Sequence, residues 1–119
     1  YRVLFLALDV PLDELTSRIE RRLDAMIEAG FVDEVKALRA RHGDEVRAFG
    51  SVGYRQVLEH LRDGIPWATT REALRVATRT YARRQRNWFR AEPGIDARVA
   101  PGALLGRDWM ARVEEHFAR

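Results

Sequence analysis

Arginines are concentrated in one segment of the chain, at a spacing that could bind a polyanion. Residues 71–90 carry seven arginines and one acidic residue, a net charge of +6, so the other 99 residues together carry −3. At about 100° per residue of a helix, six of the seven fall within an arc of about 120°. Because like charges four residues apart repel each other, acids elsewhere in the fold or a bound phosphate must neutralise them. The six residues of this arginine stripe are Arg71, Arg75, Arg79, Arg83, Arg86 and Arg90.

The end of the arginine stripe mixes three kinds of side chain that contact RNA. Residues 83–90 read Arg-Arg-Gln-Arg-Asn-Trp-Phe-Arg. Arginines and amides suit phosphates and base edges, and aromatic rings suit unstacked bases. By helical angle we expect Trp88 to face the core and Phe89 to face the arginines; the alternative is that both rings belong to the core. Arg84 falls on the apolar side, where it would reach around the helix or pair with a carboxylate.

A glycine-containing segment is a second candidate site. Residues 50–55 read Gly-Ser-Val-Gly-Tyr-Arg and place two glycines just before a predicted helix. Exposed backbone N–H groups at such a position can hold an anion. The alternative is an ordinary flexible loop, because two glycines at this spacing are not specific. The chain contains no G-x-x-x-x-G-K-[ST] pattern, so this segment is not a Walker loop.

Other kinds of site find no support in the sequence. His42, His60 and His116 show no spacing typical of metal ligands, and no serine or threonine has the partners of a nucleophilic triad. The chain has no cysteine, which excludes a thiol nucleophile, a zinc–thiolate site and an iron–sulfur cluster. No run of about 18 uncharged apolar residues occurs, so no membrane span is predicted.

The elements that must position these residues are predicted to be mainly helical. A length of 119 residues predicts one domain, and the hydrophobic fraction of 46% fits a folded core. Pro11 opens the first helix, and Gly30 is placed as its C-cap. Thr69-Thr70-Arg71-Glu72 has the form of a capping box, which would start the long arginine-bearing helix. Helices are predicted over about residues 11–30, 31–42, 54–61 and 69–90, and around residues 109–117.

The first residues of the chain predict a strand whose neighbours are missing. Val3 to Leu8 are all apolar, which is typical of a strand buried on both faces. The only other strand candidate is the alternating stretch from Ile95 to Val99. Because one or two strands do not make a stable sheet, we expect the sheet of residues 1–10 to lie mostly outside this chain. The alternative is a short edge strand, or part of a helix, packed on the helices.

Three segments resemble, in order, motifs of the tRNA dimethylallyltransferase (tRNA isopentenyltransferase) family. Residues 18–35 are similar to R-I-x-x-R-x-x-x-M-x-x-x-G-x-x-x-E-V, and residues 52–56 to V-G-Y-[RK]-[QE]. Residues 78–90 are similar to T-R-x-x-A-[KR]-[RQ]-Q-x-x-W-[FL]-R. The resemblance covers about residues 1–90, and its third motif is highly specific.

The resemblance implies an enzyme that moves a dimethylallyl group from its diphosphate to the exocyclic amine of the adenosine just 3′ of a tRNA anticodon. Arg22 matches an arginine that contacts the departing pyrophosphate, where a cation would stabilise developing negative charge. The alternative for Arg22 is a salt bridge with acids on its own helix. The tRNA-contacting residues implied are Gly50, Ser51, Val52, Gly53, Tyr54, Arg55, Arg79, Arg83, Arg84, Gln85, Arg86, Asn87, Trp88, Phe89 and Arg90.

The resemblance also implies a fold and a setting. This chain would be the mainly α C-terminal part of a P-loop α/β enzyme, with one or two strands and about five helices. Residues 1–90 would belong to the catalytic domain, and residues 91–119 would form a tail with a short strand and an amphipathic helix. The P-loop, a catalytic aspartate and the Mg²⁺ ligands are expected in the N-terminal half, so no metal site is predicted in this chain.

The partners implied are the tRNA anticodon stem-loop and dimethylallyl diphosphate, for a cytoplasmic, monomeric enzyme without membrane contact. This chain alone is not expected to transfer the group. One alternative is a stand-alone basic helical RNA-binding module without catalysis. Another is a helical adaptor whose arginines pair with an acidic protein.

Overall fold

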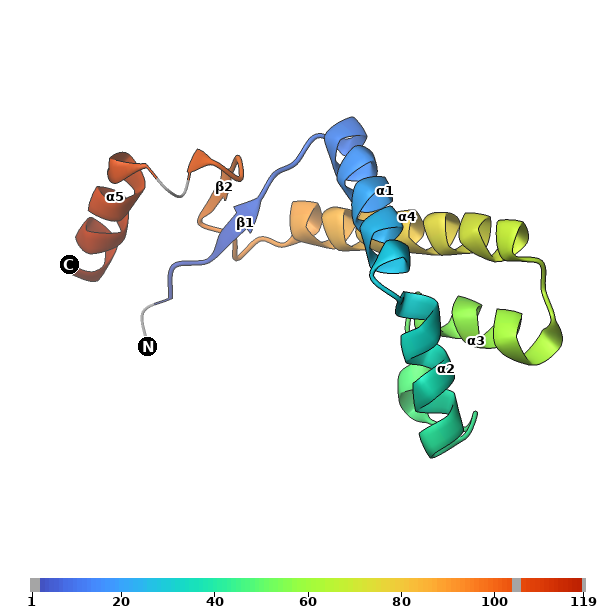
Figure 1. The fold of residues 1–119 in the computed structure, drawn as a ribbon. Helices are drawn as coiled ribbons and strands as arrows, with labels where there is room; N and C mark the ends of the chain where they lie inside the picture. The colour runs from blue at the N-terminus through green and yellow to red at the C-terminus, as the bar shows by residue number, and fades with distance from the viewer. Residues whose placement is uncertain (1–2, 104–105, 119) are drawn as a thin grey trace. The chain divides into compact units, whose positions relative to one another are not determined.

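Helices make up most of the chain, as the apolar periodicity predicts. The computed structural model describes residues 3–103 and 106–118, and these contain five α-helices, one 3-10 helix and two short strands. This confirms the prediction of a mainly α chain with one or two strands and about five helices (Figure 1). The elements are β1 (Leu6–Leu8), α1 (Leu12–Glu28), α2 (Phe31–His42), η1 (Arg47–Gly50), α3 (Tyr54–Asp63), α4 (Trp67–Ala91), β2 (Ala97–Val99) and α5 (Arg107–Ala118).

The chain divides into two compact units. Residues 16–84 form the helical unit, and residues 1–15 together with 85–119 form the strand unit. The domain boundary predicted at residue 90 stays a prediction. The core of the helical unit draws on α1, α2, η1, α3 and α4, so each of these elements is held by its apolar face. Its buried residues are Leu23, Phe31, Val35, Phe49, Val57, Leu58 and Leu74.

The junction between α1 and α2 forms as predicted. Gly30 adopts a left-handed backbone with φ of 96°, which glycine reaches without the steric penalty of a side chain. Its N–H donates to the backbone oxygen of Ile27, and α2 then starts at Phe31. Phe31 and Val35 are buried one turn apart, so α2 places its first turn against the core.

The start of α4 was predicted wrongly. The helix begins at Trp67, not at Thr69, because Pro66 provides the first backbone acceptor, to which the N–H of Thr70 donates at 3.0 Å. Thr70 is therefore inside the helix with its side chain only 2% exposed, and it caps nothing. Trp67 packs on His60 of α3, with 5.3 Å between ring centroids. This tertiary contact adds residues to the helix that the capping-box pattern left out.

The strand unit contains a two-stranded parallel sheet. β1 and β2 lie side by side, with Leu6 opposite Ala97 and Leu8 opposite Val99 (Figure 1). The sequence predicted a strand buried on both faces. Within the described residues Ala7 is buried but Leu8 is 56% exposed, so only one face of β1 is covered. Residues 1 and 2 of the predicted strand lie outside the described residues. A two-stranded sheet has only marginal stability by itself, and this one leaves the apolar side chain of Leu8 exposed.

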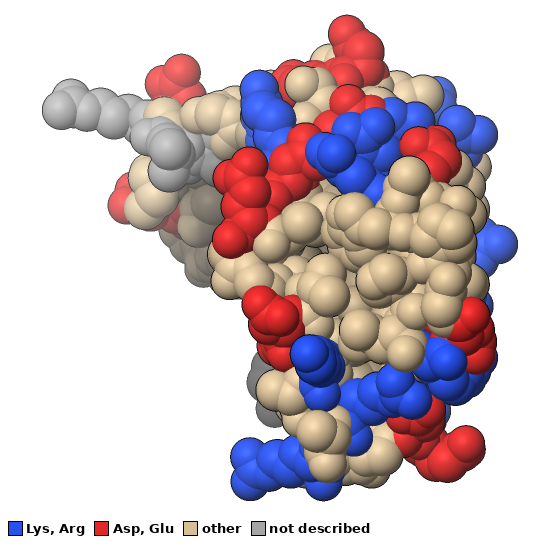
Figure 2. Space-filling view, turned by 45° about the vertical axis from the view of Figure 1, so that its right-hand side comes forward, with Lys and Arg blue, Asp and Glu red and all other residues tan. Residues whose placement is uncertain are grey.

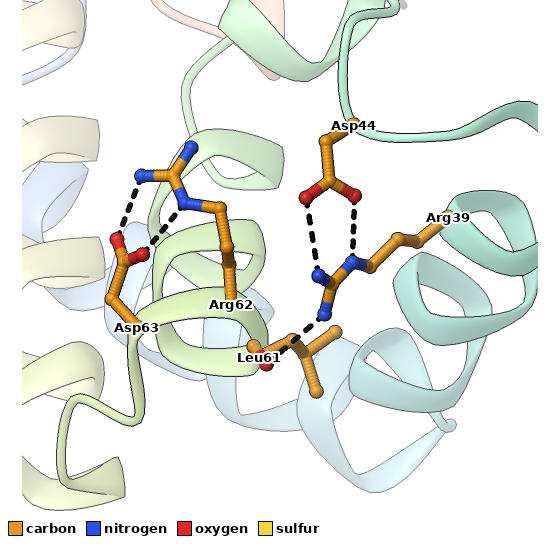
Figure 3. Close-up of polar contacts among 5 residues, drawn as sticks. All are labelled: Arg39, Asp44, Leu61, Arg62 and Asp63. Carbon is orange, nitrogen blue, oxygen red and sulfur yellow. Dashed lines mark hydrogen bonds and ion pairs between the residues drawn. The ribbon is translucent and has the colours of Figure 1, made fainter.

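Arg39 fastens the segment between α2 and α3. Its Nε and Nη2 donate to the two carboxylate oxygens of Asp44 at 2.6 and 3.1 Å, and its Nη1 donates to the backbone oxygen of Leu61 at 3.0 Å (Figure 3). One guanidinium group thus joins α2, the start of residues 43–53 and the end of α3. Arg62, drawn beside it, pairs with its own chain neighbour Asp63 at 2.7 Å.

We expect Arg39→Ala to loosen residues 43–53. Loss of these charge-assisted hydrogen bonds costs about 1.5 kcal/mol, which corresponds to backbone amides that exchange about tenfold faster. Hydrogen exchange of the full-length protein measures this directly. Arg62→Ala is the matched control, because the ion pair of Arg62 joins adjacent residues and ties no separate segment. Equal exchange rates over residues 43–53 in the two variants would contradict the role given to Arg39.

Candidate functional site

A cavity of about 570 Å³ lies within the helical unit. One face of α1 supplies part of its wall, because Ile19, Leu23 and Met26 recur at helical spacing. The rest of the wall comes from the start of α2, the glycine-containing segment and the middle of α4. The lining residues are Ile19, Arg22, Leu23, Met26, Phe31, Gly50, Ser51, Val52, Gly53, Tyr54, Thr78 and Tyr81. A mainly apolar wall with one guanidinium group suits a ligand that has both an apolar part and an anionic part.

Arg22 is the cation of this cavity. It is exposed on α1. No carboxylate in the described ranges 3–103 and 106–118 forms an ion pair with it, so the alternative of a salt bridge along α1 is not realised there. Glu20, the nearest acid before it in the sequence, pairs instead with Arg79 of α4. A guanidinium group without a carboxylate partner beside an apolar cavity is available for an external anion.

The structure brings five of the six residues of the glycine-containing segment to the cavity. Gly50, Ser51, Val52, Gly53 and Tyr54 line it, and Arg55 is exposed, with its Nε 3.9 Å from Glu59. The segment offers less to an anion than the sequence predicts. The N–H of Ser51 donates to the backbone oxygen of Ala48, and the N–H of Gly53 donates to Oε1 of Gln56. These internal hydrogen bonds shape a cavity wall more than an anion-binding turn.

Tyr54 is held at the edge of this wall. Its hydroxyl donates to Oε1 of Glu34 at 2.5 Å, and its ring meets the ring of Phe31 edge to face, with 5.2 Å between centroids. The hydrogen bond to the carboxylate raises the pKa of the Tyr54 hydroxyl above its ordinary value, because it stabilises the protonated form. Tyr54 therefore stays protonated at neutral pH.

Thr78 and Tyr81 are cavity residues to which sequence reasoning gave no role. They lie three residues apart on α4, so they share one face of the helix. The hydroxyl of Thr78 donates to the backbone oxygen of Leu74 at 2.8 Å, and Tyr81 is 53% exposed. Their three-residue spacing at the start of the segment 78–90 could have indicated that they share a face of the helix.

Two of the three arginines in the first half of the arginine stripe form ion pairs with acids of α1. Arg71 donates to Asp24 at 2.6 Å, and Arg79 pairs with Glu20. The hydrogen bond from Arg71 lowers the pKa of Asp24 below its ordinary value, so this ion pair is intact at neutral pH. Its contribution to stability is lost only in acid, as the pH falls through the lowered pKa. Of the two neutralisers that the sequence left open, acids elsewhere in the fold serve Arg71 and Arg79.

The second half of the stripe carries no such partner. Between residues 3 and 103 and between 106 and 118, no carboxylate forms an ion pair with Arg83, Arg86 or Arg90 of the stripe, or with Arg84 beside it. Arg84 was expected either to reach around the helix or to pair with a carboxylate, and the second arrangement is not formed among these residues. Gln85 and Asn87 are exposed between these arginines. Figure 2 shows acidic and basic side chains next to each other on the face that it draws, so that face is not uniformly basic.

Trp88 does not face the core as predicted. Its side chain is 56% exposed, and that of Phe89 is 39% exposed. The two rings contact each other edge to face at 4.9 Å between centroids. The prediction failed because the core contacts of α4 end near Leu74, so the angular position of Trp88 on the helix does not bring it to a core. Two exposed aromatic rings among unpaired arginines favour an external partner.

Arg98 of β2 orients the end of α4, a role that the sequence did not suggest. Its Nη2 donates to the backbone oxygens of Phe89 and Arg90 at 2.9 and 3.1 Å. A guanidinium group at the last carbonyls of a helix satisfies unpaired acceptors and suits the helix dipole. The short strand after α4 thereby fixes where residues 88–90 lie in the strand unit.

No metal site is found in the described part of the chain. Among those residues, no three His, Cys, Asp or Glu side chains gather as they would around a metal ion. These residues therefore do not fit a Mg²⁺ cage by themselves, and the prediction that the ligands belong to another part of the protein stays a prediction. The same residues include no helix that is both long and apolar enough to cross a membrane.

Comparison with known proteins decides the family. A family model described as IPP transferase matches residues 1–92. The chain belongs to the IPP transferase family. The match includes all three motifs from which the resemblance was stated, and it includes Arg22 and the whole segment 78–90.

Relatives of the IPP transferase family are longer than this chain. A tRNA dimethylallyltransferase of Acidothermus cellulolyticus is 46% identical over 107 residues, which are 88% of this chain and 34% of that protein. One of Synechococcus sp. is 39% identical over 90% of this chain and 30% of its own length. The crystal structure of the full-length tRNA isopentenylpyrophosphate transferase of Bacillus halodurans has a TM-score of 0.81, at 25% identity, over 99% of this chain and 39% of that one. This chain thus spans about a third of these relatives.

Proposed function

We propose that this chain is the tRNA-facing part of an enzyme that attaches a dimethylallyl group to tRNA. The acceptor would be the exocyclic amine of the adenosine 3′ of the anticodon, and the donor dimethylallyl diphosphate. The observation that carries the proposal is Arg22, which lies without a carboxylate partner beside a mainly apolar cavity. The apolar wall suits the prenyl group, and the guanidinium group suits the diphosphate.

The chemistry asked of Arg22 follows from the charges in the reaction. The adenosine nitrogen forms a bond to the allylic carbon while the bond from that carbon to the diphosphate oxygen breaks. The electron pair leaves with the diphosphate, and the amine loses one proton. Arg22 would stabilise the negative charge that grows on the leaving group, where a fixed cation is most effective. The base that takes the proton and the Mg²⁺ ligands would come from another part of the protein.

The arginines at the end of α4 would hold the tRNA. Arg83, Arg84, Arg86 and Arg90 would contact phosphates, and the exposed rings of Trp88 and Phe89 would meet unstacked bases. In this proposal the enzyme acts on the anticodon stem-loop in the cytoplasm as a monomer. A binding module without catalysis is the second candidate, because the same unpaired arginines would serve it equally well.

The full-length protein tests the proposal by transfer of a labelled dimethylallyl group. We expect label on an anticodon stem-loop that carries adenosine at the acceptor position, and none when guanosine replaces it. Binding of the stem-loop without transfer, by protein that is folded and supplied with Mg²⁺, would favour the non-catalytic module. Transfer to both stem-loops would contradict the proposed acceptor.

A further inference from the structure

Tyr54 is unusually well fixed for a residue of a cavity wall. Its hydroxyl is tied to Glu34 of α2, and its ring edge meets Phe31, also of α2, at an interplanar angle of 87°. Phe49 of η1 lies on a third side, with 6.4 Å between ring centroids. The ring is therefore bounded by two elements that precede it in the chain by five to 23 residues.

The backbone before Tyr54 is fixed as well. Gly53 has a φ of 97°, a conformation that residues with side chains rarely adopt. Its N–H donates to Oε1 of Gln56 at 2.8 Å, and Gln56 is only 5% exposed. With the backbone held in this way, the freedom that remains to Tyr54 is rotation of its own side chain. The hydrogen bond to Glu34 removes that freedom.

Glu34 itself does not line the cavity. It lies in the first turn of α2, next to Asp33, where both carboxylates suit the helix dipole. An acid at this position interacts favourably with the helix dipole without a side-chain partner, so the dipole does not explain the hydrogen bond between Glu34 and Tyr54. Because Tyr54 donates its proton to Glu34, its hydroxyl is directed at a carboxylate and not at a substrate, which leaves the ring as the part that faces the cavity.

We propose that Glu34 is a positioning residue that holds the Tyr54 ring in the cavity wall, and that Tyr54 serves tRNA through its ring and not as an acid or base. The choice of tRNA as the ligand rests on the proposed function, and the positioning of Tyr54 rests on its observed hydrogen bond to Glu34. A ring held in one orientation presents a ready apolar surface, so less freedom is lost when RNA binds. Tyr54 lies directly between Gly53 and Arg55, within the segment expected to contact tRNA.

Steady-state kinetics of the full-length enzyme tests this positioning. We expect Glu34→Ala to raise the KM for the anticodon stem-loop about fivefold to tenfold, the loss typical of one hydrogen bond. Tyr54→Phe should give the same change, and the double variant no more than either single one. Glu34→Gln keeps an acceptor oxygen at the same reach and should stay within about twofold of wild type.

Asp33→Ala is the matched control, since it removes the neighbouring carboxylate of the same helical turn and should leave the KM for the stem-loop unchanged. The proposal is overturned if Glu34→Ala behaves like Asp33→Ala, if Glu34→Gln is as impaired as Glu34→Ala, or if the effects of Glu34→Ala and Tyr54→Phe add.

An ultraviolet titration of the tyrosines needs no substrate, and it separates this proposal from the proposed function. Glu34→Ala should lower the pKa of the Tyr54 hydroxyl toward its ordinary value, with Tyr54→Phe identifying the signal. A wild-type enzyme that transfers no group would refute the proposed function while this titration still decides whether Glu34 holds Tyr54. An unchanged titration would refute the contact.

Discussion

Replacement of Arg22 by alanine in the full-length enzyme is expected to lower kcat by about 100-fold or more. In the proposed reaction negative charge grows on the diphosphate as it leaves, and removal of one group that stabilises such charge typically costs this much. Arg22 has no carboxylate partner in the described part of the chain, so its positive charge is not already used within the fold. Single-turnover transfer of labelled dimethylallyl to tRNA measures the chemical step without product release.

Arg21→Ala is the control for this experiment. Arg21 is the arginine directly before Arg22 on α1, is exposed and does not line the cavity, so its loss should leave kcat within about twofold of wild type. Arg22→Lys should recover part of the lost rate, because it restores the charge but not the planar, two-pronged donor. A similar loss of rate in the Arg21→Ala and Arg22→Ala variants would argue against a role of Arg22 in the reaction. So would an unfolding temperature that Arg22→Ala lowers and Arg21→Ala does not, because the loss of rate would then follow from lost stability.

The helices could be predicted because their signals are local. Apolar residues at helical spacing and a glycine at the end of α1 act within a few residues of each other, and Gly30 adopts the left-handed backbone that its position requires. The start of α4 depends on more distant residues. Trp67 is in the helix because it packs on His60 of another helix, and the pattern beginning at Thr69 contains no trace of that contact.

The candidate site was predicted in part. The motif at residues 52–56 and the helical position of Arg22 pointed to two of its walls, and the structure brings both to one cavity. The pairing of α4 with α1 could not be predicted, because it requires two helices to align so that Glu20 and Asp24 meet Arg79 and Arg71. The sequence shows only that the stripe needs a neutraliser. Which arginines find one inside the protein is a property of the fold.

This division of the arginine stripe has a measurable consequence for RNA binding. Replacing Arg83, Arg86 and Arg90 together by alanine should weaken binding of the full-length protein to an anticodon stem-loop. Each phosphate contact that is lost should lower the slope of log affinity against log salt by about 0.7 to 0.9. Three contacts would therefore lower it by about two to three, with a loss of affinity that is largest at low salt.

Replacing Arg71 and Arg79 by alanine is the matched comparison, because these arginines belong to the same stripe but already have partners on α1. This variant should keep the wild-type salt slope and instead unfold at a slightly lower temperature, since exposed ion pairs contribute little to stability. Titrations at three or more salt concentrations distinguish the two variants. If both lower the slope equally, the whole stripe contacts RNA and the ion pairs with α1 open on binding. If neither does, the unpaired arginines at the end of α4 have another partner.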